Sequence, residues 1–189
     1  MSNEYKDWEK DTIEEQTQVI EKYPFLRARD IDGTIDTKSK FPMIGLEVPD
    51  GWLKLFFQMC SDIKPLLEKE GVMDDFYFLQ VKEKHGELTC YSNGVASLEV
   101  EQIIQKYKYL SRFICAYCGK PAIYVTSGYI LPFCEGCWKD NFRHDRCSKL
   151  EFISTYEITT FKKGQYHSHI IDVEDEWNRY LKGIGYDGI

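Results

Sequence analysis

Cys115-Ala116-Tyr117-Cys118 is followed, fifteen residues later, by Cys134-Glu135-Gly136-Cys137. Two cysteines three positions apart on a tight backbone turn, a knuckle, can direct both sulfurs at one point, and a hairpin can bring back a second knuckle to complete a tetrahedron. Zn²⁺ favours four thiolates in this geometry, with no open position for water. Gly119 suits the first knuckle, which usually needs a positive φ angle. The spacing therefore predicts one structural Zn²⁺ ion bound by Cys115, Cys118, Cys134 and Cys137.

The alternative for these cysteines is a pair of disulfides or four unrelated thiols. Disulfides persist in oxidising compartments, and the polar, acidic residues 1–7 resemble neither a signal peptide nor a transit peptide. We therefore expect reduced cysteines and a cytoplasmic location. The remaining cysteines are Cys60, Cys90 and Cys147, and the first two lie in apolar patterns that predict ordinary buried thiols.

Composition indicates a globular chain. Of its 189 residues, 43% are hydrophobic and 15% are aromatic. These fractions allow a buried core and exclude an intrinsically disordered protein. No apolar run approaches the roughly 18 residues that a membrane span needs, so we expect no membrane partner.

The net charge of −7 is unevenly distributed. Residues 1–50 carry 7 basic and 12 acidic side chains, residues 51–100 carry 5 and 8, residues 101–150 carry 8 and 4, and residues 151–189 carry 4 and 7. Only the quarter with the cysteine pairs is basic. A Zn²⁺ ion on four thiolates would lower its net charge to about +2, which is little for a nucleic-acid binder.

Hydrophobic periodicity predicts the elements of the N-terminal half. We expect a helix over residues 3–23 and, because residues 25–50 show no sustained period, a long loop over the surface. Residues 76–82 and 87–91 carry the aromatic and branched side chains of a β-hairpin. Ser97 then precedes another helical pattern.

The strongest helical stripe runs from Trp52 to Leu67, with apolar residues recurring at three and four positions. Pro65 removes a backbone hydrogen bond and is expected to kink or split this helix, with Ser61 as a possible cap for the second piece. Gly71 is the expected terminator.

The residues between and after the cysteine pairs predict a compact zinc element. Residues 122–126 and 129–133 are expected to form a hairpin, and residues 134–143 a short helical or turn segment that carries the second pair. Either a zinc ribbon or a treble clef, in which a helix supplies the second knuckle, fits this order. The start of the helix distinguishes the two.

The last forty residues predict two strands, over residues 150–161 and 165–173, and a closing helix. His167 and His169 alternate along the second strand, so both imidazoles point to the same side. Two histidines on a strand face can bind a metal, but no third ligand can be placed. An exposed polar strand face is the favoured interpretation.

These elements together predict an α+β fold in which helices pack on short antiparallel β-hairpins, with a four-cysteine zinc ribbon or treble clef embedded in it. We divide the chain into an N-terminal helix and acidic loop (1–50), an α/β core (51–112), the zinc element (113–148) and a C-terminal hairpin with its closing helix (149–189). All four are expected to form one compact unit.

Five stretches occur in an informative order. They are Pro49-Asp50-Gly51-Trp52, Leu79-Gln80-Val81-Lys82-Glu83-Lys84-His85-Gly86, Cys115-Ala116-Tyr117-Cys118-Gly119-Lys120-Pro121, Cys134-Glu135-Gly136-Cys137 and Glu176-Trp177-Asn178-Arg179-Tyr180-Leu181. In this order the chain resembles, over about residues 20–185, a family of small, poorly characterised proteins of bacteria and their phages. The resemblance implies a zinc-bearing cytoplasmic protein, in the host cytoplasm if phage-encoded, and no assigned reaction. A phage or mobile-element origin favours an inhibitor or regulator of a host protein.

Three classes of function follow. The first is a protein-interaction module whose zinc holds a binding surface, which the acidic balance and the many tyrosines and tryptophans favour. The second is nucleic-acid binding through the zinc element, with Tyr117, Tyr124 and Trp138 available for stacking. Its candidate contacts are Lys106, Lys108, Arg112, Lys120, Trp138, Lys139, Arg143 and Arg146.

The third class is an enzyme. A zinc closed by four cysteines has no position for water, so catalysis would have to come from elsewhere. The sequence shows no Gly-rich phosphate loop, no nucleophile elbow and no paired histidine and carboxylate at motif spacing. His85 lies in a predicted turn and is interpreted as a solvated loop residue. We therefore expect a non-enzymatic protein partner as the main function, with nucleic acid as the alternative.

Overall fold

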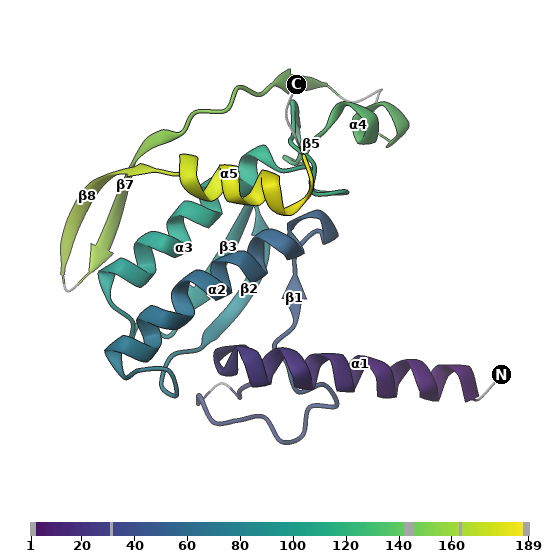
Figure 1. Cartoon of the computed structure of the whole chain (residues 1–189), viewed down its shortest axis with the longest axis vertical. Helices are drawn as coiled ribbons and strands as arrows, with labels where there is room; N and C mark the ends of the chain where they lie inside the picture. The colour runs from purple at the N-terminus through teal and green to yellow at the C-terminus, as the bar shows by residue number, and fades with distance from the viewer. Residues whose placement is uncertain (1–2, 31, 142–145, 163, 187–189) are drawn as a thin grey trace.

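The computed structural model describes residues 3–30, 32–141, 146–162 and 164–186. They form the expected α+β fold, with five α-helices and three small sheets in this part of the chain (Figure 1). The helices are α1 (Asn3–Lys22), α2 (Leu53–Glu70), α3 (Leu98–Leu110), α4 (Glu135–Asn141) and α5 (Glu174–Gly183). The strands are β1 (Leu46–Glu47), β2 (Phe78–Lys84), β3 (Glu87–Ser92), β4 (Tyr124–Thr126), β5 (Pro132–Phe133), β6 (Cys147–Lys149), β7 (Thr155–Lys162) and β8 (Gln165–Asp172).

The three sheets contain all the predicted hairpins. The first has the order β1-β2-β3, the second β5-β4-β6, and the third is the two-stranded pair β7-β8. The hairpins β2–β3, β4–β5 and β7–β8 are antiparallel, as the sequence predicts. Strands β1 and β6 were not predicted, because each is only two or three residues long and has no alternation of its own.

The predicted surface loop over residues 25–50 is wrong at both of its ends. Phe25 and Leu26 form part of a short 3₁₀ turn and are fully buried. Strand β1 pairs in parallel with β2, with Leu46 opposite Val81. The loop therefore begins in the core and ends in the first sheet.

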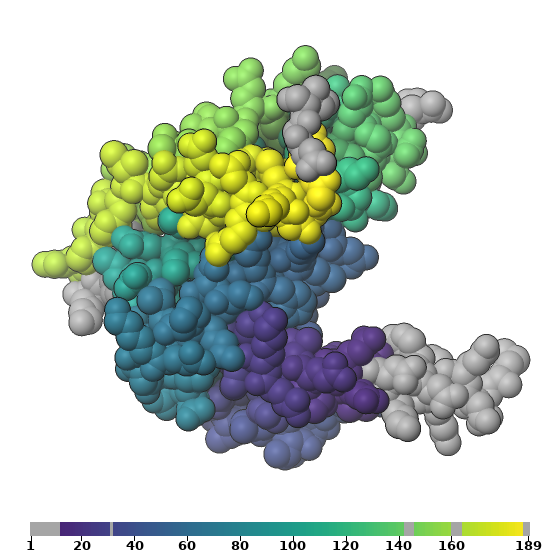
Figure 2. Space-filling view, viewed as in Figure 1, coloured from purple at the N-terminus to yellow at the C-terminus, as the bar shows by residue number. Residues whose placement is uncertain are grey.

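The core is centred on α2. Figure 1 shows α2 and α3 side by side, with α5 across one end of the pair and α1 on the opposite side. In Figure 2 the N-terminal segment and the C-terminal segment likewise cover opposite sides of the α2 segment. The predicted stripe on α2 is buried, and one continuous apolar cluster extends from Ile20 to Tyr180.

A polar network joins α2, α3 and α5 at the edge of this core. The Tyr107 hydroxyl donates to an Asp62 carboxylate oxygen at 2.5 Å, and the Arg179 guanidinium contacts both oxygens of the same carboxylate. Tyr107 itself is fully buried, and its pKa is raised by burial and by Asp62. The network therefore fixes the three helices relative to one another.

The helix is not split at Pro65, since α2 is one helix from Leu53 to Glu70, and a kink at Pro65 stays a prediction. Ile63 and Leu67, on either side of Pro65, are fully buried, and this packing offsets the lost hydrogen bond. The Ser61 hydroxyl contacts the Phe57 carbonyl oxygen instead of capping a second helix. Gly71 ends the helix as predicted, with a φ of 70°.

The remaining helix signals are confirmed. Ser97 caps α3, its hydroxyl oxygen accepting from the Val100 N–H at 3.3 Å. Within the described residues, no helix is both long enough and apolar enough to cross a membrane.

Candidate metal centre

The four predicted cysteines converge on one point. The sulfur atoms of Cys115, Cys118, Cys134 and Cys137 all lie within 4.8 Å of one another. The sulfurs of Cys118 and Cys134 are 3.6 Å apart. Four sulfurs around a tetrahedral metal with bonds of about 2.3 Å would be about 3.8 Å apart. The cluster is therefore close enough to bind one metal ion.

The first knuckle is built from backbone hydrogen bonds. The Cys115 N–H donates to the Lys120 carbonyl oxygen at 2.7 Å, and the Gly119 N–H donates to the Cys115 carbonyl oxygen at 3.0 Å. Gly119 has the predicted positive φ, at 74°. This tight turn places both sulfurs on the same side of the chain.

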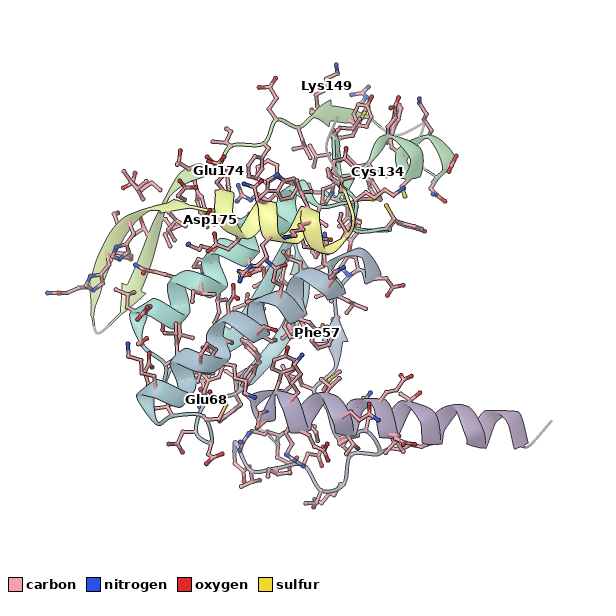
Figure 3. The ribbon with its side chains drawn as sticks, viewed as in Figure 1. Phe57, Glu68, Cys134, Lys149, Glu174 and Asp175 are labelled. Carbon is pink, nitrogen blue, oxygen red and sulfur yellow. The ribbon has the colours of Figure 1, made fainter. Side chains whose placement is uncertain are left out.

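The second pair of cysteines lies at the start of α4, where Figure 3 labels Cys134. Cys134 directly follows β5, and Cys137 lies in the first turn of the helix. The Cys137 N–H contacts the Cys134 sulfur at 3.5 Å, and the Trp138 N–H donates to the Cys134 carbonyl oxygen at 3.0 Å. The hairpin β4–β5 joins this helix start to the first knuckle.

The protonation of the four thiols depends on their surroundings. Burial raises the pKa of Cys115, and burial together with the neighbouring thiols raises the pKa of Cys137. At Cys118 burial is outweighed by hydrogen bonds from the Lys120 backbone and the other cysteines, which lower the pKa. Without a metal some of these groups keep their protons, and a divalent cation is what makes four adjacent thiolates favourable.

The knuckle is fixed to the body of the protein by three contacts. The Gly51 N–H donates to the Ala116 carbonyl oxygen at 3.0 Å, and the buried Trp52 indole donates to the Ile114 carbonyl oxygen at 2.9 Å. From α5, the Tyr180 hydroxyl donates to the Gly119 carbonyl oxygen at 2.7 Å. The cluster is thus an extension of the core, with Cys115 fully buried and Cys118 exposed.

Gly51 was missed as a functional position by sequence reasoning. A Cβ atom there would lie 2.2 Å from the Cys115 carbonyl oxygen and 2.7 Å from the Gly119 nitrogen. Only a glycine allows the short turn just before α2 to approach the knuckle this closely. The sequence offers no signal for this approach, because Gly51 and Gly119 are 68 positions apart.

The other cysteines stay outside the cluster. Cys147, on β6, is half-buried and belongs to no metal-binding group among the described residues. Cys60 is fully buried, as predicted. Cys90 is half-buried and not fully buried as predicted. Burial raises the pKa of both thiols, that of Cys90 to about 12, so both are protonated at neutral pH.

His167 and His169 lie side by side on β8, as the alternation predicts. Their ring centroids are 6.3 Å apart and their planes are nearly parallel, at 8°. No third cysteine, histidine or carboxylate joins them in the part of the chain that the structure describes. A second metal site is not formed there by described residues.

Four of the eight candidate nucleic-acid contacts form ion pairs. Acidic residues pair with Lys106 (Glu176, 2.7 Å), with Lys139 (Glu135, 2.5 Å), and with both Lys108 and Arg112 (Glu87). Lys120 and Arg146 are exposed, and Arg143 lies outside the described residues. Trp138 is half-buried against Tyr124, with ring centroids 4.7 Å apart. Much of the positive charge in this quarter is therefore already paired.

Comparison with known proteins gives no match to any protein-family model, curated protein or solved structure. The chain's function is therefore argued from its own residues.

Gly51→Ala tests the attachment of the knuckle. We expect the added methyl group to lower the free energy of unfolding by about 1–3 kcal/mol, because its nearest neighbours are backbone atoms that cannot turn away. Gly136→Ala is the matched control, since a Cβ in α4 meets nothing within 4 Å. Thermal unfolding of the two variants measures the difference, and equal melting temperatures would contradict the close approach.

Cys118→Ser tests the metal centre. We expect this variant to lose bound metal and much of its stability, because structural zinc contributes on the order of 10 kcal/mol to the folding of small domains. Cys147→Ser and Cys60→Ser are the controls and are expected to keep full metal content. Elemental analysis and thermal unfolding check all three. A Cys118→Ser protein with unchanged metal and melting would remove the site.

Proposed function

We propose that this chain is a non-enzymatic, zinc-stabilised protein-interaction module. The observation that carries the proposal is where the exposed apolar side chains lie. Half of the large apolar side chains that are exposed among the described residues lie on the zinc element or just after it. They are Tyr117, Ile123, Tyr129, Ile130, Phe152 and Ile153.

Two of these residues are tyrosines with the character of interface anchors. Tyr129 is 71% exposed and Tyr117 is 57% exposed. Tyrosine is enriched among the residues that contribute most to protein interfaces, because its ring buries a large area while its hydroxyl still finds partners. Both tyrosines lie on backbone that the metal cluster holds in place, so they are ordered before a partner arrives.

Zn²⁺ is the metal that best suits the cluster. Four soft thiolates and no carboxylate or histidine favour zinc over magnesium, calcium or manganese, and a closed set of four sulfurs is typical of structural zinc. A helix that begins at Glu135 and carries Cys137 in its first turn supports a treble clef rather than a ribbon. In this proposal the zinc organises a surface and takes no part in a reaction.

Nucleic acid remains the second candidate, favoured only by the basic charge of residues 101–150. The pairing of Lys106, Lys108, Arg112 and Lys139 with carboxylates lowers the charge available for phosphates. A protein partner requires no such charge.

The biological setting is also part of this proposal. The resemblance to small bacterial and phage proteins supports an inhibitor or regulator of a host protein, acting in a reducing cytoplasm. The free thiols of all seven cysteines are in keeping with that compartment.

Affinity capture from the host, followed by binding measurements with the purified partner, tests the proposal. We expect Tyr117→Ser and Ile153→Ser to weaken binding of the captured protein at least about tenfold, because each removes an exposed apolar anchor. Ile170→Ser on β8, at a side chain that is 81% exposed, is the matched control and is expected to bind normally. All three variants should keep their metal.

The same protein is titrated with duplex and single-stranded DNA at low and moderate salt. Recovery of no specific protein, or equal binding by all three variants, would overturn the interaction module. Strong, salt-sensitive DNA binding without a protein partner would establish the second candidate instead.

A further inference from the structure

A polar pocket of about 440 Å³ lies between the β2–β3 hairpin and α3. Residues from the hairpin turn and from β3 form one wall, and Ile104, Gln105 and Lys108 of α3 form the other. We call it the β3–α3 pocket. Its volume falls within the range of small-molecule sites, roughly 300–1,000 Å³, and is far larger than a single ion requires.

Thr89 gives the first indication of a ligand. Its side chain is only 8% exposed, and it lines the β3–α3 pocket. The hydroxyl oxygen is buried and has no hydrogen-bond partner among the described residues. Buried hydroxyls in folded proteins are almost always paired, so this one would gain a partner if the Thr89 side chain turned its hydroxyl toward a group in the pocket.

The charge of the pocket indicates the sign of that group. Lys84 and Lys108 line it from opposite walls. The Lys84 ammonium donates to the Tyr91 hydroxyl at 3.2 Å, and Lys82 lies 5.6 Å from the centre of the same ring. The pKa of Tyr91 is lowered by the Lys84 hydrogen bond and by the charges of Lys84, Lys82 and Lys108. Three lysines, Lys82, Lys84 and Lys108, thus lie around this pocket in a chain whose net charge is −7.

One carboxylate, that of Glu87, also lines the pocket. It is already shared by two cations, since Lys108 lies 3.1 Å from one oxygen and Arg112 contacts the other. Glu87 therefore fixes the Lys108 side chain at the wall and leaves the pocket with an excess of positive charge.

His85 adds a further donor at the hairpin turn. It is the one non-glycine residue with a positive φ, 54°, in the described part of the chain, and it lines the pocket next to Lys84. The two-residue turn His85-Gly86 belongs to the type in which asparagine and glycine are usual at the first position. The turn thereby places His85 at the edge of the pocket.

We propose that the β3–α3 pocket binds the phosphate group of a small phosphorylated molecule, with Lys84, Lys108 and, after its side chain turns toward the pocket, the Thr89 hydroxyl as donors. Three donors from two walls suit an anion with several oxygens, and the remaining volume accommodates an organic group beside the exposed Tyr91 ring. A nucleic-acid strand fits less well, because its phosphates need a basic track along the surface, whereas Lys84 and Lys108 line a single pocket.

Titration of the metal-loaded protein, followed by amide chemical shifts, tests this proposal. The probes are inorganic phosphate, adenosine monophosphate and a ten-residue oligothymidine. We expect saturable shifts at Lys84, Thr89 and Lys108 with phosphate and larger affinity for the monophosphate. Lys84→Ala and Thr89→Val are expected to weaken both about tenfold or more, because each removes a donor to a charged group. Lys64→Ala, on α2, is the control with unchanged binding.

Thr89→Val carries a second readout that separates a binding role from a structural one. Because it replaces an unpartnered buried hydroxyl by a methyl group of similar shape, its melting temperature without ligand is expected to hold or rise. A clear fall would show that Thr89 is a structural residue and would overturn its role as a donor. The proposal also fails if neither phosphate nor the monophosphate binds saturably, if the variants bind as the parent does, or if only the oligonucleotide binds. None of these outcomes bears on the protein-interaction surface.

Discussion

Four sulfur atoms gathered within 4.8 Å are the constraint on which the rest of the structure depends. Four neighbouring thiolates repel one another. Four neighbouring protonated thiols supply no strong attraction that would hold their short loops together. A divalent cation removes both problems, because it replaces the protons and supplies the attraction that holds the loops together. The hairpin β4–β5 and helix α4 are too short to bury a core of their own. We therefore propose that a bound metal determines their arrangement.

The metal cluster and the apolar core stabilise each other. Cys115 and Ala116 are buried within the main apolar cluster, and the short turn just before α2 touches the knuckle through Gly51. The zinc element also reaches the first sheet, where the Tyr129 hydroxyl donates to the Glu83 carboxylate at 2.7 Å. Glu83 in turn accepts from the Gly86 N–H at 2.8 Å, at the turn that borders the β3–α3 pocket. The β2–β3 hairpin thus borders the proposed ligand pocket and also contacts the proposed interaction surface through Glu83 and Tyr129.

Local features of the chain could be predicted from the sequence, because they depend on residues close in sequence. The knuckle spacing, the α2 stripe, the Ser97 cap and the hairpins are of this kind. Features that depend on distant residues could not be predicted. Pro65 is tolerated because the surrounding helix is buried, and the approach of Gly51 to the knuckle involves segments far apart along the chain. Three basic residues of the zinc quarter, Lys106, Lys108 and Arg112, pair with carboxylates, Glu176 and Glu87, that lie elsewhere in the sequence.

X-ray absorption at the zinc edge of the purified, untagged chain tests the central claim most directly. The account predicts one zinc per chain with a first shell of four sulfurs at about 2.3 Å and no nitrogen or oxygen neighbour. A chain that folds without tightly bound metal would contradict it. So would a shell that includes oxygen or nitrogen, because such a centre would not be closed by the four cysteines.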